Sequence, residues 1–253
     1  MKKRFAAFVS TVLAAVLCAC SAAPKDVLPN KAAQPTEAPT QQAQTTQAAP
    51  TEQPTPEPDP VQQLLEEMTL EQKVGQLFLV RPDSLDLSQT QDQINDAKAD
   101  GVTELTDAMR QTLAEYPVGG VVIFGKNLES PQQITQFLDD LQQASDTPLF
   151  TAIDEEGGLV ARLANNAAFD LPQYESAAAV GTSGNPEDAR AMGRTIGGYL
   201  KEYGFNLDFA PVADVNTNPD NPVIGTRAFS SEPQTAADLV GGACAGFADA
   251  GIA

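Results

Sequence analysis

Residues 149–162 read Leu-Phe-Thr-Ala-Ile-Asp-Glu-Glu-Gly-Gly-Leu-Val-Ala-Arg, and this segment decides the fold prediction. Its first five residues form a mostly apolar, β-favouring run of the kind found in buried parallel strands. Ligands of α/β folds bind at the carboxyl ends of the strands, so Asp154 occupies a position typical of a catalytic or ligand-binding group. Gly157 and Gly158 favour a sharp turn or a close approach of the backbone to a ligand. The alternative interpretation is a strand followed by an acidic, solvated turn.

Strand and helix signals alternate on both sides of this segment. We expect strands at 77–80, 118–124, 149–153 and 205–211, and helices at 60–67, 104–116, 131–145, 186–203 and 233–250. Residues 83–101 are polar without a clear period, and we interpret them as a partly helical insertion. Alternation of this kind predicts an α/β fold with a parallel sheet.

The size of this pattern suggests a TIM-barrel-like (β/α)₈ fold that is incomplete. A barrel of this kind needs eight strands and typically about 250 folded residues. Residues 61–253 provide fewer, with about the first four strand–helix units. A fifth strand is expected to begin where the sequence stops.

Local signals fix several helix ends. Thr69 and Gln72 form a capping box, and Ser130 and Gln133 have the same spacing around a proline at the first helical position. Gly204 is a suitable C-terminal stop for the helix before it.

The N-terminus resembles a bacterial lipoprotein signal. A basic segment, residues 2–4, precedes an apolar run at 5–17 that is short for a membrane span, and the run ends in a lipobox-like sequence at Cys20. We therefore predict a signal peptide at 1–20, lipidation at Cys20, and an extracytoplasmic protein anchored to the bacterial cell membrane. The alternative is a plain secretory signal with an incidental cysteine.

Residues 21–60 are rich in Pro, Thr, Gln, Ala and Glu and contain no aromatic residue. Such a composition buries too little apolar surface to offset its ordering entropy, so we predict a disordered linker. The folded domain is expected at 61–253.

The overall charge and the absence of histidine narrow the possible partners and sites. The net charge is −19 at pH 7, which disfavours nucleic acid. The chain has no histidine, so histidine-based triads and most zinc sites are excluded within these residues. Asp208 and Asp214 have no recognised metal spacing. We expect neither a metal nor a cofactor.

Three blocks resemble family 3 glycoside hydrolases, in the bacterial β-N-acetylhexosaminidase branch. They are the Asp-Glu-Glu-Gly-Gly-Leu-Val-Ala-Arg segment at 154–162, the Phe-Ala-Pro-Val-Ala-Asp-Val-Asn segment that opens residues 209–229, and the opening at 68–78. The resemblance covers roughly residues 61–253. Leu159 departs from the arginine that the family usually has at that position.

The resemblance implies removal of terminal β-linked N-acetylglucosamine, for example from peptidoglycan fragments, with retention of configuration. It implies that Asp154, Arg162 and Arg227 bind the carbohydrate substrate. In this family the His–Asp acid/base dyad and the aspartate nucleophile follow later in the chain. No catalytic residue is therefore expected within these 253 residues, and this chain alone is expected to be inactive.

Three alternatives remain from the residues themselves. Asp154 and Glu156 have the composition of a paired-carboxylate site for glycoside hydrolysis, although the resemblance argues against that role. Arg227 lies in an Asn/Pro/Gly-rich loop that could be solvated, but its loop position favours ligand contact. The parent protein could also be a non-catalytic glycan-binding surface lipoprotein.

Overall fold

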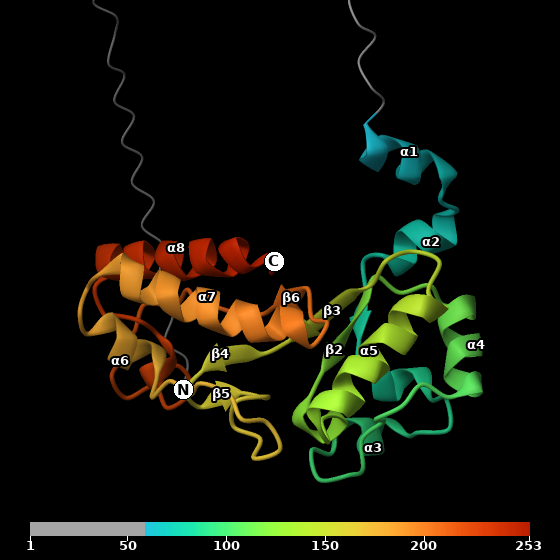
Figure 1. The fold of residues 1–253 in the computed structure, drawn as a ribbon, viewed down its shortest axis with the longest axis horizontal. Helices are drawn as coiled ribbons and strands as arrows, with labels where there is room; N and C mark the ends of the chain where they lie inside the picture. The colour runs from blue at the N-terminus through green and yellow to red at the C-terminus, as the bar shows by residue number, and fades with distance from the viewer. Residues whose placement is uncertain (1–58) are drawn as a thin grey trace, which may run out of the picture. The chain divides into compact units, whose positions relative to one another are not determined.

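The computed structural model describes residues 59–253 (Figure 1). The predicted signal peptide at 1–20, with Cys20, and the linker up to residue 58 lie outside the described residues. Helix α1 (Pro60–Glu67) begins where the sequence predicts, and the Asp59 carboxylate accepts a hydrogen bond from the Val61 amide at its start. Of the helices between residues 59 and 253, none is both long and apolar enough to cross a membrane.

Four parallel strands form the main sheet. In spatial order they are β1 (Leu79–Val80), β2 (Gly120–Ile123), β3 (Phe150–Ile153) and β6 (Leu207–Asp208). The helices that follow them in turn are α4 (Asp107–Glu115), α5 (Pro131–Ala144), α7 (Pro186–Glu202) and α8 (Pro233–Ala250). This order confirms the predicted α/β class and the four strand–helix units of a (β/α)₈-type barrel.

Shorter elements fill the connections. They are α2 (Leu70–Gly75), the 3₁₀ turns η1 (Pro82–Leu85), η2 (Gly125–Asn127) and η3 (Gly225–Arg227), α3 (Gln91–Asn95), the hairpin strands β4 (Glu155–Gly157) and β5 (Val160–Ala161), and α6 (Ala177–Gly181). The insertion at 83–101 is partly helical, as predicted. The hairpin and α6 are absent from the sequence prediction, and β1 and β6 are each shorter than predicted.

The helices begin at the predicted capping residues and bury one face. Thr69 and Gln72 form the capping box of α2, and Ser130 caps α5. Four apolar residues of α5 recur at helical spacing and are fully buried: Ile134, Phe137, Leu138 and Leu141. Complete burial of such side chains contributes about 1.5–3 kcal/mol each. Figure 1 shows α7 and α8 packed along one another.

The outer edge of β6 is already partly paired. The Asp208 amide donates to the Ala253 carbonyl at 2.9 Å, and the Ala253 amide donates to the Asn206 carbonyl at 3.0 Å. This alternation is the hydrogen-bond pattern of parallel strands. The last residue of the chain therefore lies where a fifth strand is predicted to begin.

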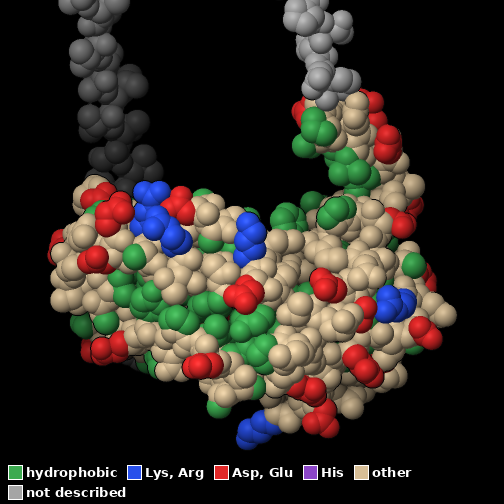
Figure 2. All heavy atoms as spheres, viewed as in Figure 1, with side chains coloured by type: hydrophobic (Ala, Val, Ile, Leu, Met, Phe, Trp, Pro, Cys, Tyr) green, Lys and Arg blue, Asp and Glu red, His purple; other side chains and the backbone are tan. Residues whose placement is uncertain are grey.

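One face of the described domain is rich in acidic side chains (Figure 2). On the face seen in Figure 2, acidic side chains lie over many parts of the described domain and basic side chains are fewer. Such a distribution is typical of a solvated acidic surface.

Candidate functional site

The parallel strands bring polar residues to one edge of the sheet. The registers pair Ile123 with Ile153 and Ile153 with Asp208, so Phe124 and Asp154 leave adjacent strands at the same level. Arg81 follows β1 at this same carboxyl edge. In open and closed α/β sheets, this edge is where ligands bind.

Asp154 and Arg162 come together at this edge, although eight positions separate them. The β4–β5 hairpin turns the chain back, and Arg162 Nη2 donates to Asp154 Oδ2 at 3.1 Å. Both side chains remain partly accessible: that of Arg162 is 34% exposed and that of Asp154 is 26% exposed. The pair can therefore contact a ligand while its two members orient each other.

The two glycines of the hairpin allow this turn. Gly157 and Gly158 have φ of 83° and 68°, which is the left-handed region that favours glycine. A Cβ atom on Gly157 would lie 2.5 Å from the Met192 methyl group. The predicted sharp turn is thus confirmed, and Leu159 at its tip is 78% exposed.

Arg227 reaches the same region from the long loop after β6. Its Nε and Nη2 donate to the two carboxylate oxygens of Glu156 at 2.8 and 2.7 Å. This bidentate contact raises the pKa of Arg227, and the charges of Asp214 and Asp154 act in the same direction. The Arg227 side chain is 25% exposed, whereas that of Glu156 is 7% exposed. Arg227 is therefore held in place by Glu156 rather than solvated.

Glu155 is buried, which contradicts the alternative of an acidic solvated turn. Its carboxylate accepts from the Leu163 and Ala164 amides at 2.8 and 2.9 Å and from the Tyr199 hydroxyl at 2.8 Å. Burial raises the pKa of Glu155, although these donors oppose the shift. Glu155 therefore anchors the hairpin to α7, so its role is structural.

Asp208 ends β6 beneath this hairpin. Its Oδ1 accepts from the Glu155 amide at 2.9 Å, and its buried Oδ2 has no partner among the described residues. Burial raises the pKa of Asp208 to about 8, with the neighbouring charge of Glu155 acting in the same direction. Asp214 is exposed and makes no side-chain hydrogen bond within residues 59–253.

The arrangement suits recognition of hydroxyl groups better than proton transfer. Asp154 and Glu156 each accept hydrogen bonds from an arginine, and that contact orients the carboxylate. Such carboxylates can accept from sugar hydroxyls, and the arginines can donate to sugar oxygens. Residues 59–253 contain no cluster of potential ligands suited to a metal ion.

Sequence reasoning missed two residues of this edge, Phe124 and Arg81. The Arg81 guanidinium carbon lies 4.2 Å from the centre of the Phe124 ring, and that of Arg162 lies 5.6 Å from it. Their positions directly after strands were a usable signal.

Comparison with known proteins agrees with this geometry. Residues 69–253 match the family described as the glycosyl hydrolase family 3 N-terminal domain. The β-hexosaminidase A of Pseudoalteromonas piscicida is 36% identical over 143 residues, which is 54% of this chain and 24% of that protein. The β-hexosaminidase LpqI of Mycobacterium tuberculosis is 33% identical over 156 residues, or 60% of this chain and 38% of that protein.

Solved structures show the same fold. A glycoside hydrolase family 3 β-N-acetylglucosaminidase from Paenibacillus sp. str. FPU-7 has a TM-score of 0.62 and 35% identity, and it covers 74% of this chain and 32% of that chain. The chain thus spans less than half the length of these relatives. Because the family model spans well over half of its residues, this chain belongs to glycosyl hydrolase family 3.

Proposed function

We propose that the complete protein, meaning the product of the whole reading frame that contains these 253 residues, is a β-N-acetylhexosaminidase. Its reaction removes terminal β-linked N-acetylglucosamine from glycans such as peptidoglycan fragments, with retention of configuration. The observation that carries the proposal is the Asp154–Arg162 pair at the carboxyl edge of the sheet, within a family 3 domain. The names of the relatives, β-hexosaminidase and β-N-acetylglucosaminidase, support the substrate class.

Three residues bind the sugar in this proposal. Asp154 accepts hydrogen bonds from sugar hydroxyls through the carboxylate oxygen that Arg162 leaves free. Arg162 and Arg227 donate to sugar oxygens, since each guanidinium has five N–H groups and uses only some of them within the protein.

The catalytic groups are assigned to other residues of the complete protein. Family 3 enzymes of this branch resemble one another in using a His–Asp dyad and an aspartate nucleophile, and this chain has no histidine. Glu156 is held by Arg227, and Asp208 is buried beneath the hairpin. Neither carboxyl group is placed to replace the missing dyad.

The proposed setting is the outer side of the bacterial cell membrane. Lipidation at Cys20 and the linker that follows it support this setting, because they would hold the domain away from the membrane surface. Glycans outside the cytoplasm would then be accessible to it.

The alternative function is a non-catalytic glycan-binding lipoprotein with the same sugar site. Two results separate the two functions. If the protein is the enzyme, the DNA downstream of codon 253 should encode a Lys-His-Phe-Pro-Gly-His-Gly loop and a later aspartate. The complete protein should also hydrolyse an aryl β-N-acetylglucosaminide, and NMR should show the β-anomer as the first product. Binding of N-acetylglucosamine without any hydrolysis would favour the alternative, and an α-anomer as first product would contradict retention.

A further inference from the structure

A cavity adjoins the proposed sugar site. It has a volume of about 390 Å³ and is lined by residues that include Arg81, Asn95, Phe124, Lys126 and Arg162. Arg162 also contacts Asp154, so one guanidinium borders both the sugar site and this cavity. We call this cavity the Arg81 pocket.

Lys126 contributes little net charge to the Arg81 pocket. Its ammonium lies 3.3 Å from Asp83, which is fully buried, and it donates to the Gln93 and Ile94 carbonyls at 3.1 Å each. Its side chain is 6% exposed. Lys126 and Asp83 therefore form an internally neutral pair that ties the insertion to the end of β2.

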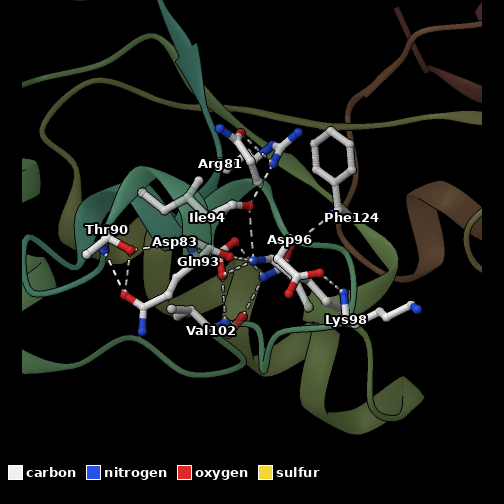
Figure 3. A network of polar contacts seen from close by, with 12 residues as sticks. Arg81, Asp83, Thr90, Gln93, Ile94, Asp96, Lys98, Val102 and Phe124 are labelled. Carbon is white, nitrogen blue, oxygen red and sulfur yellow. Dashed lines mark hydrogen bonds and ion pairs between the residues drawn. The ribbon is translucent and has the colours of Figure 1, made fainter.

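Arg81 differs from Lys126 because its partners are neutral. Its Nη1 donates to the Ile94 carbonyl at 2.7 Å and to the Asn95 side-chain oxygen at 3.4 Å. Figure 3 shows its guanidinium between the Ile94 carbonyl and the Phe124 ring. Its Nε and Nη2 donate to no acceptor in the described part of the chain, and no carboxylate there pairs with it.

Arg162 adds a second unused donor. Its Nε is buried and has no hydrogen-bond partner within residues 59–253. A buried N–H without a partner is costly, so a ligand that supplies an acceptor there would gain affinity. Two arginines with unused donors thus line one cavity, and among residues 59–253 the only carboxylate paired with either guanidinium is Asp154.

We propose that the Arg81 pocket binds an oxyanion substituent carried by the glycan in the sugar site. This inference rests on the proposed function and adds a specificity determinant to it. A carboxylate or a sulfate or phosphate ester has the planar or tetrahedral acceptor geometry that arginine matches best. Burial beside an aromatic ring strengthens such a contact by excluding water.

The test compares three non-hydrolysable sugars by isothermal titration calorimetry on the complete protein. They are methyl thio-β-N-acetylglucosaminide, its 6-sulfate and its 3-O-carboxyethyl ether. Comparison of the two charged sugars shows whether the pocket prefers a sulfate ester or a carboxylate. At least one charged sugar should bind about tenfold or more tightly than the neutral sugar, and added salt should reduce that preference.

Arg81→Gln should remove the preference and leave the neutral sugar's Kd within about twofold, because glutamine can still donate to the Ile94 carbonyl. Arg81→Lys keeps the positive charge but loses the planar guanidinium, so it should retain part of the preference for the charged sugar. This variant also tests the inference if Arg81→Gln fails to fold. Arg110→Gln is the matched control. Arg110 on α4 forms an ion pair with Asp140 on α5, and it lies outside the Arg81 pocket.

Equal affinity for all three sugars would overturn the inference and leave the proposed function intact. A preference that survives in Arg81→Gln would also overturn it, because the anion would then bind elsewhere. Tight, Arg81-dependent binding of a charged sugar without binding of the neutral sugar would support the pocket and count against the proposed function. Binding of none of the three would contradict both.

Discussion

Replacing Arg227 by methionine should destabilise the domain far more than a surface arginine replacement would. The change leaves the Glu156 carboxylate, whose side chain is 7% exposed, without its two hydrogen bonds from Arg227. Two charges at about 4 Å attract by roughly 4 kcal/mol at an effective dielectric constant of about 20. Breaking a buried pair typically costs about 3–5 kcal/mol, and the 25% exposure of Arg227 lowers that figure. We expect a loss of about 2–4 kcal/mol.

Urea unfolding at pH 7 measures this loss without the ionic screening that guanidinium chloride would add. Arg194→Met is the matched control, because Arg194 also forms a 2.8 Å ion pair, with Asp249, but is 57% exposed. That control should lose less than about 1 kcal/mol. Adding Glu156→Gln to Arg227→Met should restore at least half of the lost stability, because no unpaired charge then remains.

Two outcomes would refute this reasoning. The first is a loss for Arg227→Met that lies within about 0.5 kcal/mol of the loss for Arg194→Met. The second is a double variant that is no more stable than the single one, because burial of the Glu156 charge would then not be the cause.

Three further predictions concern buried groups and anchoring. Asp208 has a folded pKa of about 8, above its usual value, so its stabilising contribution is complete below about pH 4 and falls as the pH rises to 8. The unfolding free energy, taken relative to that of Asp208→Asn, should therefore fall by roughly 1 kcal/mol per pH unit between pH 5 and 7. A difference between the two proteins that stays constant with pH would contradict the raised pKa. Tyr199→Phe removes a donor to the buried Glu155 carboxylate and should cost about 1.5–3 kcal/mol in urea unfolding; a cost under about 0.5 would remove Glu155 as an anchor. Cys20→Ala should release the protein from the detergent phase and abolish incorporation of labelled palmitate, whereas unchanged partitioning would exclude the lipid anchor.

The sequence was sufficient for the sheet and its helices because their signals are local. The capping residues Ser130 and Thr69 and the apolar spacing in α5 each act within a few residues, and all three agree with the structure. The observed strand order, in which successive strands of the main sheet are neighbours, is the usual one for strand–helix units of this length. The lengths of β1 and β6 were overestimated. The Leu77 amide still donates to the Val74 carbonyl of the preceding helix, and Phe209 is 47% exposed and lies outside β6, although its amide donates to the Ile153 carbonyl.

The site was only partly predictable because its contacts are long-range. Asp154 was recognised from its place at the end of a strand, but its pairing with Arg162 requires the hairpin that the two glycines form. The partner of Arg227 is 71 positions away in sequence. Burial of Glu155 depends on Tyr199 of α7, which no local pattern reveals.

The central claim is that Asp154 binds the sugar in a working hexosaminidase site. The most direct measurement is kcat/KM of the complete protein and of Asp154→Ala on 4-nitrophenyl N-acetyl-β-glucosaminide. Loss of a hydrogen-bonding partner of a bound ligand costs on the order of 1–3 kcal/mol, and more where a charge takes part, so kcat/KM should fall at least about tenfold. Leu159→Arg, at a site that is 78% exposed, should leave kcat/KM unchanged or slightly raised. Wild-type kinetics in Asp154→Ala would contradict the claim.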